Sequence, residues 1–258
     1  MATWLSWPRG PSCISNLIGE CILSLRERTY KSQYSYARKS IDLVWTLASG
    51  KAPFFTRAPT SWDPIFPLPR PAALSESELT SPPLHWDVRL SHAFTDLQDL
   101  CQQINSTVRE RGRYNATRFG SVLTSLQSRL LFLRGELEEP MQELMRIAML
   151  ALITTTFVVP GRKMPYNWVG KELPEIFGRI DLRGGEGLRR QLVWVLVVAA
   201  STVVGVAEGW VREAWREIAA GLSWDEVRKD LMEIMWIEVA HDGVGEFVFA
   251  QLKAVQGE

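Results

Sequence analysis

The chain has 258 residues, 46% of them hydrophobic, which is enough for one large domain or two small ones with a substantial core. Its 29 basic and 29 acidic residues give a formal net charge of zero, so the composition does not demand a basic face for nucleic acid. Three scattered cysteines, Cys13, Cys21 and Cys101, argue against a disulfide scaffold and favour a reducing compartment.

The N-terminal stretch MATWLSWPRG lacks the basic start and apolar core of a secretory signal. The longest uncharged run, Gln191 to Ala207, is at the lower limit of the roughly 17–25 residues that span a bilayer, and it contains polar and small residues. We therefore interpret this run as a helix buried on all sides. We expect an intracellular protein, cytoplasmic or nuclear, without a membrane span.

Two helices are expected near the N-terminus, over residues 14–28 and 30–47, because apolar residues recur there at steps of three and four. The following segment, residues 50–83, is rich in proline, which excludes long helices and central strands. Its apolar side chains predict that it packs on the body as a connector; they are Phe54, Phe55, Trp62, Ile65 and Phe66.

The helical period returns after the connector, and eight further helices are expected, over 88–108, 118–134, 140–159, 171–179, 188–206, 208–220, 223–236 and 243–252. Ser223 and Glu226 have the spacing of a capping box. Pro160 and Gly161 are expected to end the third of these helices. Neither a βαβ alternation nor a hairpin signal is present.

The pattern predicts an all-α fold, a single helical bundle-like domain of about nine or ten helices with the proline-rich connector packed on it. The expected parts are an N-terminal helical pair over residues 1–49, the connector over 50–85, and a main α-helical domain over 86–258. The pair and the main domain are expected to form one compact unit.

Several of these segments, taken in order, resemble the C-terminal regulatory region of fungal zinc-cluster transcription factors. The similar stretches run from Trp86 to Trp236, and they are WDVRLSHAFTDLQDLCQQIN, SLQSRLLFL, ALITTTFVVPGRKMPYNWVGKEL, LVWVLVVAAS and WVREAWREIAAGLSWDEVRKDLMEIMW. The resemblance implies an α-helical domain of fungal origin, in which the Thr-rich run is a buried helix and Pro-Gly-Arg is its exit turn.

The chain departs from that family in its cysteines. The family's DNA-binding module needs six cysteines in two CxxC-containing halves, whereas the three cysteines here are far apart and are not spaced to hold zinc tetrahedrally. We therefore expect no direct sequence-specific DNA binding by the family's route.

Three residues are candidate catalytic groups. Tyr166 lies in the turn after the Thr-rich helix, and Arg134, near the end of an apolar helix, is a candidate anchor for a carboxylate. His85 lies where the connector meets the helical body. The alternatives are structural: Tyr166 wedges the helix end, and Arg134 pairs with Glu136 or Glu138.

Five further residues are candidate substrate-binding groups: Trp86, Arg162, Trp168, Trp194 and His241. Tryptophans supply flat apolar walls, and the arginine and histidine supply polar atoms beside them. Here too there are structural alternatives, because Trp194 lies on the most apolar helix and is core by default, and packing explains Trp86 and Trp168.

Two functions fit these observations. Metal, nucleotide and nucleophile motifs are missing, so no cofactor is expected, and the first function is a cofactor-free cyclisation or isomerisation of a hydrophobic small molecule in fungal secondary metabolism. An intramolecular, Diels-Alderase-like cycloaddition is accelerated chiefly by folding the substrate into a reactive shape. The expected pocket for this is lined by Trp86, Trp168 and Trp194. The alternative is a transcription-regulator-type domain that binds a metabolite or a protein without its own DNA reader. The missing zinc cluster favours the first function, and the sequence leaves room for a homodimer.

Overall fold

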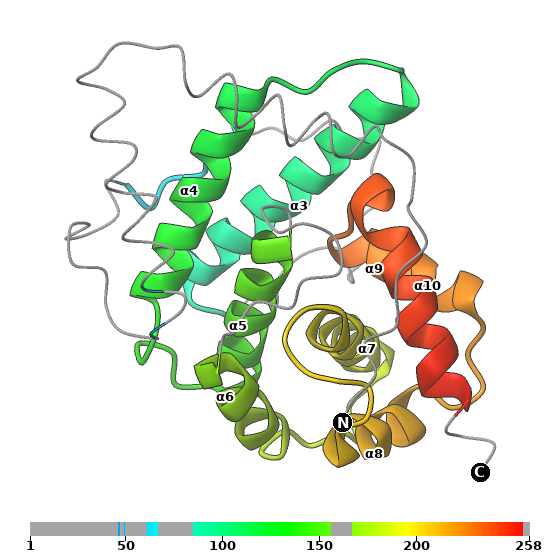
Figure 1. The fold of residues 1–258 in the computed structure, drawn as a ribbon. Coiled ribbons are helices and arrows are strands. Elements are labelled where there is room, and N and C mark those ends of the chain that lie inside the picture. Colours follow the sequence, from blue (N-terminus) through cyan, green and yellow to red (C-terminus); the bar gives the residue numbers. More distant parts are fainter. Residues whose placement is uncertain (1–45, 47–48, 50–60, 67–84, 156–166, 255–258) are drawn as a thin grey trace.

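The structure is a computed structural model that describes residues 46, 49, 61–66, 85–155 and 167–254. These ranges contain eight α-helices and no strand (Figure 1), so the predicted all-α class is confirmed, with eight helices described against the nine or ten expected for the whole chain. The predicted N-terminal helical pair lies outside the described residues, apart from Thr46 and Ser49, which are both helical.

The helices follow one another in chain order: α3 (Val88–Arg109), α4 (Ala116–Phe132), α5 (Pro140–Thr155), α6 (Asn167–Phe177), α7 (Glu186–Thr202), α8 (Gly209–Ile218), α9 (Trp224–Ile234) and α10 (Glu238–Ala254). Each corresponds to a predicted helix. The turn at Pro160 and Gly161, which was expected to end α5, lies outside the described residues.

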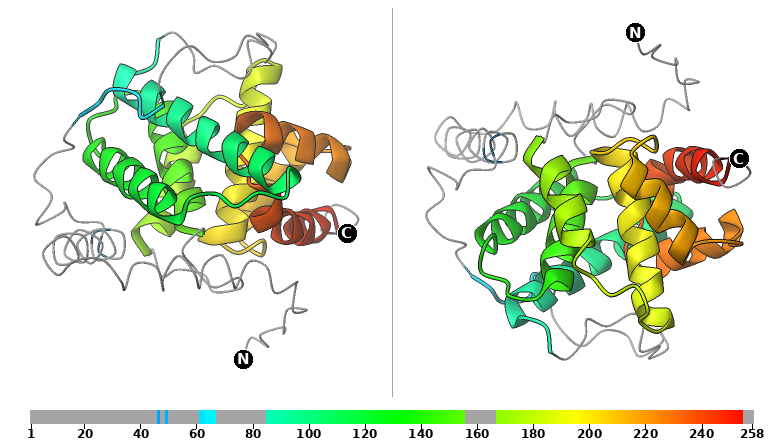
Figure 2. Two further views of the ribbon diagram at one scale, coloured as in Figure 1. Left: turned by 90° about the horizontal axis from the view of Figure 1, so that it is seen from above. Right: turned by 90° about the horizontal axis from the view of Figure 1, so that it is seen from below.

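Helix α7 occupies the centre of the bundle, and Figure 1 looks down its axis. Every side chain from Leu192 to Ala200 is at most 3% exposed. Helices α5, α8, α9 and α10 pack around it, while α3 and α4 pack on the side of α5 (Figures 1 and 2). The predicted buried helix is confirmed as far as Thr202, where α7 ends; the predicted run continued to Ala207, and Val203, Val206 and Ala207 are partly or fully exposed. None of the helices in the described ranges combines the length and the apolar character that a bilayer crossing requires.

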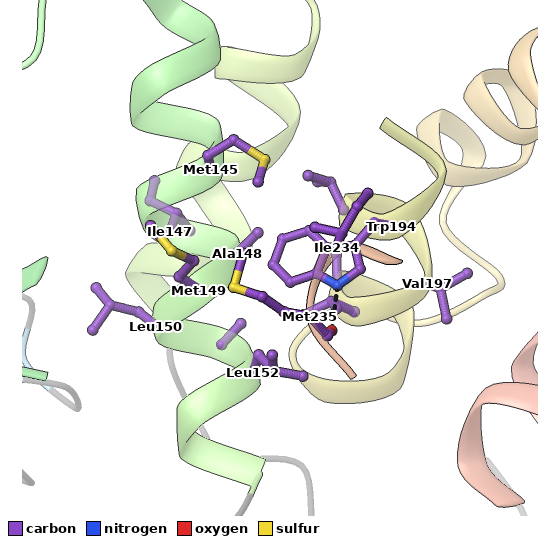
Figure 3. Packing of buried hydrophobic residues seen from close by; sticks show 14 of the residues in the cluster. Met145, Ile147, Ala148, Met149, Leu150, Leu152, Trp194, Val197, Ile234 and Met235 are labelled. Carbon is purple, nitrogen blue, oxygen red and sulfur yellow. Dashed lines mark hydrogen bonds between the residues drawn. The ribbon is translucent and has the colours of Figure 1, made fainter. Parts of the chain in front are cut away.

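The core between α5 and α7 combines aliphatic side chains with methionines and one tryptophan ring. Figure 3 shows Met145 and Ala148 on the side of α5 that faces Trp194 of α7, with Met235, at the end of α9, next to them. These residues are fully buried or nearly so. Methionine fills irregular gaps beside a rigid indole ring, which suits a core where helices cross at different angles.

Two helix starts differ in how well the local sequence predicts them. At α9, the Ser223 hydroxyl accepts from the Glu226 backbone N–H and the Glu226 carboxylate accepts from the Ser223 N–H, so the predicted capping box is confirmed. Helix α10 begins at Glu238, five residues before the predicted start at Gly243. Its first N–H groups find acceptors that no local pattern shows: the Glu238 N–H donates to Oδ1 of Asn105 on α3, at 3.0 Å.

The connector packs on the body over residues 61–66, as predicted. Phe66 is 6% exposed and belongs to the hydrophobic core, while Trp62 and Ile65 are half-buried against it. The remainder of the predicted connector, apart from His85, lies outside the described residues.

Candidate functional site

The structure brings together two of the predicted site residues, Arg134 and Trp168. The guanidinium carbon of Arg134 lies 4.4 Å from the centre of the Trp168 ring, and the same guanidinium pairs with Glu172 of α6. The pairing partner is therefore on another helix and is not one of the neighbouring acids considered from the sequence. Arg162 and Tyr166, the two predicted residues of the preceding turn, lie outside the described residues.

Trp86 and Trp194 are parts of the hydrophobic core. Trp194 is 0% exposed, and its indole Nε1 donates a hydrogen bond of 2.7 Å to the Met235 carbonyl, drawn as a dashed line in Figure 3. Trp86 is 6% exposed and packs edge-on against Phe94, with 5.7 Å between ring centres. A pocket shared by Trp86, Trp168 and Trp194 stays a prediction.

The two predicted site histidines have opposite environments. His85 is exposed, and its Nε2 lies 3.4 Å from a carboxylate oxygen of Glu139. His241 is buried, and its Nδ1 accepts from the Ile237 backbone N–H. Burial lowers the pKa of His241 from 6.5 to about 4, against the opposing effect of Asp242, so its imidazole is neutral near pH 7.

A cleft that sequence reasoning missed lies between the C-terminal end of α3 and the start of α10. Its volume is about 250 Å³, and its lining residues are Asn105, Val108, Arg109, Glu238, Val239 and Asp242. None of the predicted site residues lines it. Val108 is 39% exposed and Val239 is 40% exposed, and in the described ranges only Val88 and Phe247 are comparably exposed large apolar side chains. The cleft therefore presents apolar surface to solvent.

The floor of the cleft is held by Asn105, whose side chain bonds to both ends of a short connection. Its amide Nδ2 donates to the Trp236 carbonyl at 2.7 Å, and its Oδ1 accepts from the Glu238 N–H at 3.0 Å. One buried side chain on α3 thus fixes the start of α10, because buried backbone groups need partners and these two find theirs in Asn105.

The rim of the cleft is a network of paired charges. Arg109 of α3 pairs with Glu238 of α10. Arg228 of α9 donates to Glu238 at 2.9 Å and to Asp242 at 3.0 Å, and Asp242 also accepts from Nε1 of Trp236 at 2.9 Å. Both carboxylates on the rim are therefore engaged with groups of the protein itself.

The connection between α9 and α10 is held from two further sides. Nε2 of Gln98 on α3 donates to the Glu233 and Ile234 carbonyls, at 3.0 and 3.1 Å. Trp194 supplies the donor for the Met235 carbonyl. Side chains of α3 and α7 thus supply donors to carbonyl groups at the end of α9 and in the connection that follows it.

The described ranges contain no cluster of three or more histidine, cysteine, aspartate or glutamate side chains that could hold a metal ion. Cys101 is buried in the core, and desolvation raises the pKa of its thiol to about 12, which makes it a packing residue and not a nucleophile. Comparisons of the chain with protein-family models, with curated proteins and with solved structures found no match.

Proposed function

We propose that the chain is a helical domain of the regulatory type that acts by binding a protein partner at the α3–α10 cleft. The observation that carries this proposal is the pair of exposed valines, Val108 and Val239, set in a cleft whose walls are fixed by hydrogen bonds. An exposed apolar patch inside a polar rim is the common design of a protein interaction site.

The size of the cleft favours a partner's side chains over a whole small molecule. Small-molecule sites usually enclose about 300–1,000 Å³ and bury most of their ligand. At about 250 Å³ and open to solvent at both valines, this cleft suits one or two apolar side chains that project from a protein surface. Arg109 and Glu238 on the rim would then contact the polar surroundings of those side chains.

The sequence resemblance supports the same proposal. Segments between Trp86 and Trp236 resemble, in order, the regulatory region of fungal zinc-cluster transcription factors. Val108 lies between the first two of these segments, and Val239 follows the last one.

Site-specific photo-crosslinking tests the proposal. A photoreactive amino acid replaces Val239 in the full chain, and a matched control places it at Val88, which is 63% exposed at the other end of α3. Because a 22-residue helix separates the two ends of α3 by about 30 Å, one docked partner does not reach both positions in the same way. We expect a discrete protein adduct in cells from position 239 and none from position 88. Identical adducts from both positions, or none from 239, would contradict the proposal.

A second candidate, the cofactor-free cyclisation, is favoured by the stacking of Arg134 on Trp168. A hydrogen-bond donor beside an aromatic wall can polarise a substrate carbonyl, and Arg134, which pairs with Glu172 in the structure, would supply it with its remaining N–H groups. If this function holds, Arg134→Met causes a precursor with the mass of the product to accumulate while Val239→Arg does not. The binding proposal expects Arg134→Met to behave as the unaltered chain and Val239→Arg to lower transcripts and their metabolites together.

A further inference from the structure

Side chains of α3 and α4 hold residues 61–66 against the body of the protein. The segment is irregular and runs beside the N-terminal part of α3 (cyan in Figure 2). Asp96 of α3, which is 0% exposed, accepts from the backbone N–H groups of Ile65 and Phe66 through Oδ1, at 2.8 and 3.3 Å. Its other oxygen, Oδ2, accepts from Arg129 of α4 at 3.0 Å.

Two further side chains engage the carbonyl groups of the same segment. Nη2 of Arg129 donates to the Asp63 carbonyl at 2.7 Å, and Nδ1 of His92 lies 2.8 Å from the Trp62 carbonyl oxygen. Together with Asp96, these side chains contact four backbone groups of the segment, at residues 62, 63, 65 and 66. Such contacts depend on the course of the backbone and not on the covalent link between the segment and the body.

Aromatic side chains of the segment are held by stacking. The Arg89 guanidinium lies 5.5 Å from the centre of the Trp62 ring, and the Arg118 guanidinium lies 5.5 Å from the centre of the Phe66 ring. The Phe66 side chain is also buried in the core. Backbone contacts and aromatic anchors are the two components that give a peptide site its affinity and its specificity.

The segment leaves one donor of this site unused. Nε of Arg129 is buried, and it has no hydrogen-bond partner among the described residues. The contacts of the segment therefore use Nη2 of Arg129, while Nη1 pairs with Asp96, and its Nε takes no part in them.

We propose that His92, Asp96 and Arg129, flanked by Arg89 and Arg118, form a peptide-binding site that the chain occupies with its own residues 61–66. We call it the strap site. A peptide of the same pattern, an aromatic residue followed by Asp-Pro, an aliphatic residue and a second aromatic residue, binds there when the chain's own segment leaves. This site lies apart from the α3–α10 cleft, and it does not depend on the function proposed for that cleft.

A binding experiment with the full chain tests this. The triple variant Trp62→Ser, Ile65→Ser, Phe66→Ser vacates the strap site, and the probe is a fluorescent peptide with the sequence of residues 60–67, TSWDPIFP. We expect the peptide to bind the triple variant at least about tenfold more tightly than the unaltered chain, because the chain's own segment competes in the latter.

Asp96→Asn, added to the triple variant, removes the charged acceptor and is expected to weaken peptide binding by about tenfold or more. The matched control is Asp181→Asn, which makes the same chemical change at an exposed turn and leaves binding unchanged. A folded triple variant that does not bind the peptide, or that binds it equally with and without Asp96→Asn, would overturn the proposal.

Hydrogen exchange in the unaltered chain decides the matter if the triple variant does not fold. The backbone N–H groups of Ile65 and Phe66 donate to Asp96, so displacement of the segment exposes them to exchange. Excess peptide is expected to accelerate their exchange by about tenfold and to leave the amides of α7 unchanged. Unchanged exchange at both positions under saturating peptide would overturn the proposal.

Discussion

Asn105 joins α3 to the start of α10 through one side chain, and its energetic role follows from what its removal leaves behind. Asn105→Ala leaves the Trp236 carbonyl and the Glu238 N–H without their present partner. Because an unsatisfied buried polar group costs about 1–3 kcal/mol, we expect a loss of about 2–4 kcal/mol in the free energy of unfolding. Denaturant unfolding measures it. The control, Ser106→Ala at the next, exposed position, is expected to cost much less. Equal losses would show that the Asn105 bonds contribute little.

His241 makes the stability of the protein depend on pH. Its pKa is lowered to about 4 in the folded protein, whereas an unfolded chain has the ordinary value of 6.5, so the unfolded state binds the proton more readily between these two values. The contribution of His241 to stability is therefore present above pH 6.5 and is lost as the pH falls towards 4, by about 3 kcal/mol at most.

Denaturant unfolding of the unaltered chain and of His241→Gln, over pH 4 to 7, tests this. Burial raises the pKa of Asp96 and of Asp230, and these groups act in the opposite direction by favouring the folded state at low pH. The difference between the two proteins isolates His241. We expect this difference to shrink as the pH falls, and a difference that stays constant would contradict the assignment.

At the scale of single elements, α10 contains two glycines with opposite surroundings. A Cβ atom at Gly245 would lie 2.8 Å from the Trp236 ring and 2.9 Å from the Trp224 ring, whereas one at Gly243 would meet nothing within 4 Å. Alanine gains about 1 kcal/mol over glycine inside a helix, but overpacking a core costs about 1–3 kcal/mol.

We therefore expect Gly243→Ala to raise the free energy of unfolding by up to about 1 kcal/mol and Gly245→Ala to lower it. The two variants make the same chemical change two positions apart in one helix, so each is the control for the other. A stabilising Gly245→Ala would mean that the two tryptophan rings move aside at little cost.

Helices α9 and α10 show why the sequence predicts some features and not others. The capping box of α9 is local, since Ser223 and Glu226 are three residues apart, and a pattern of the chain displays it. The start of α10 depends on Asn105, and the partner of Arg134 is Glu172; both contacts join residues that are far apart in the chain. Periodicity therefore predicted that these helices exist, and tertiary contacts decided where α10 begins and which acid Arg134 meets.

The candidate site follows the same rule. The tryptophans that composition singled out, Trp86 and Trp194, are core residues in the structure, because burial is the simplest outcome for large apolar side chains. The α3–α10 cleft combines Val108 with Val239, which no motif or spacing connects. Only the fold brings the two exposed valines together.

At the scale of the whole molecule, the exposed valines of the cleft lie apart from the buried centre. Helix α7 and the faces packed around it form the buried centre (Figure 1), while the cleft lies at the surface between α3 and α10. A substitution at the exposed Val239 is thus expected to change partner binding without unfolding the protein. This separation allows a surface variant to test function directly.

The most direct measurement replaces the gene in its own host with Val239→Arg and, as the matched control, with Val88→Arg, and then profiles metabolites and the transcripts of neighbouring genes. The binding account predicts that Val239→Arg reproduces the full deletion at a normal protein level, with transcripts and their metabolites falling together, and that Val88→Arg behaves as the unaltered strain. If Val239→Arg has no effect, and the deletion strain accumulates one precursor with the mass of the product at steady transcript levels, the account is wrong and the protein is a cyclase or isomerase.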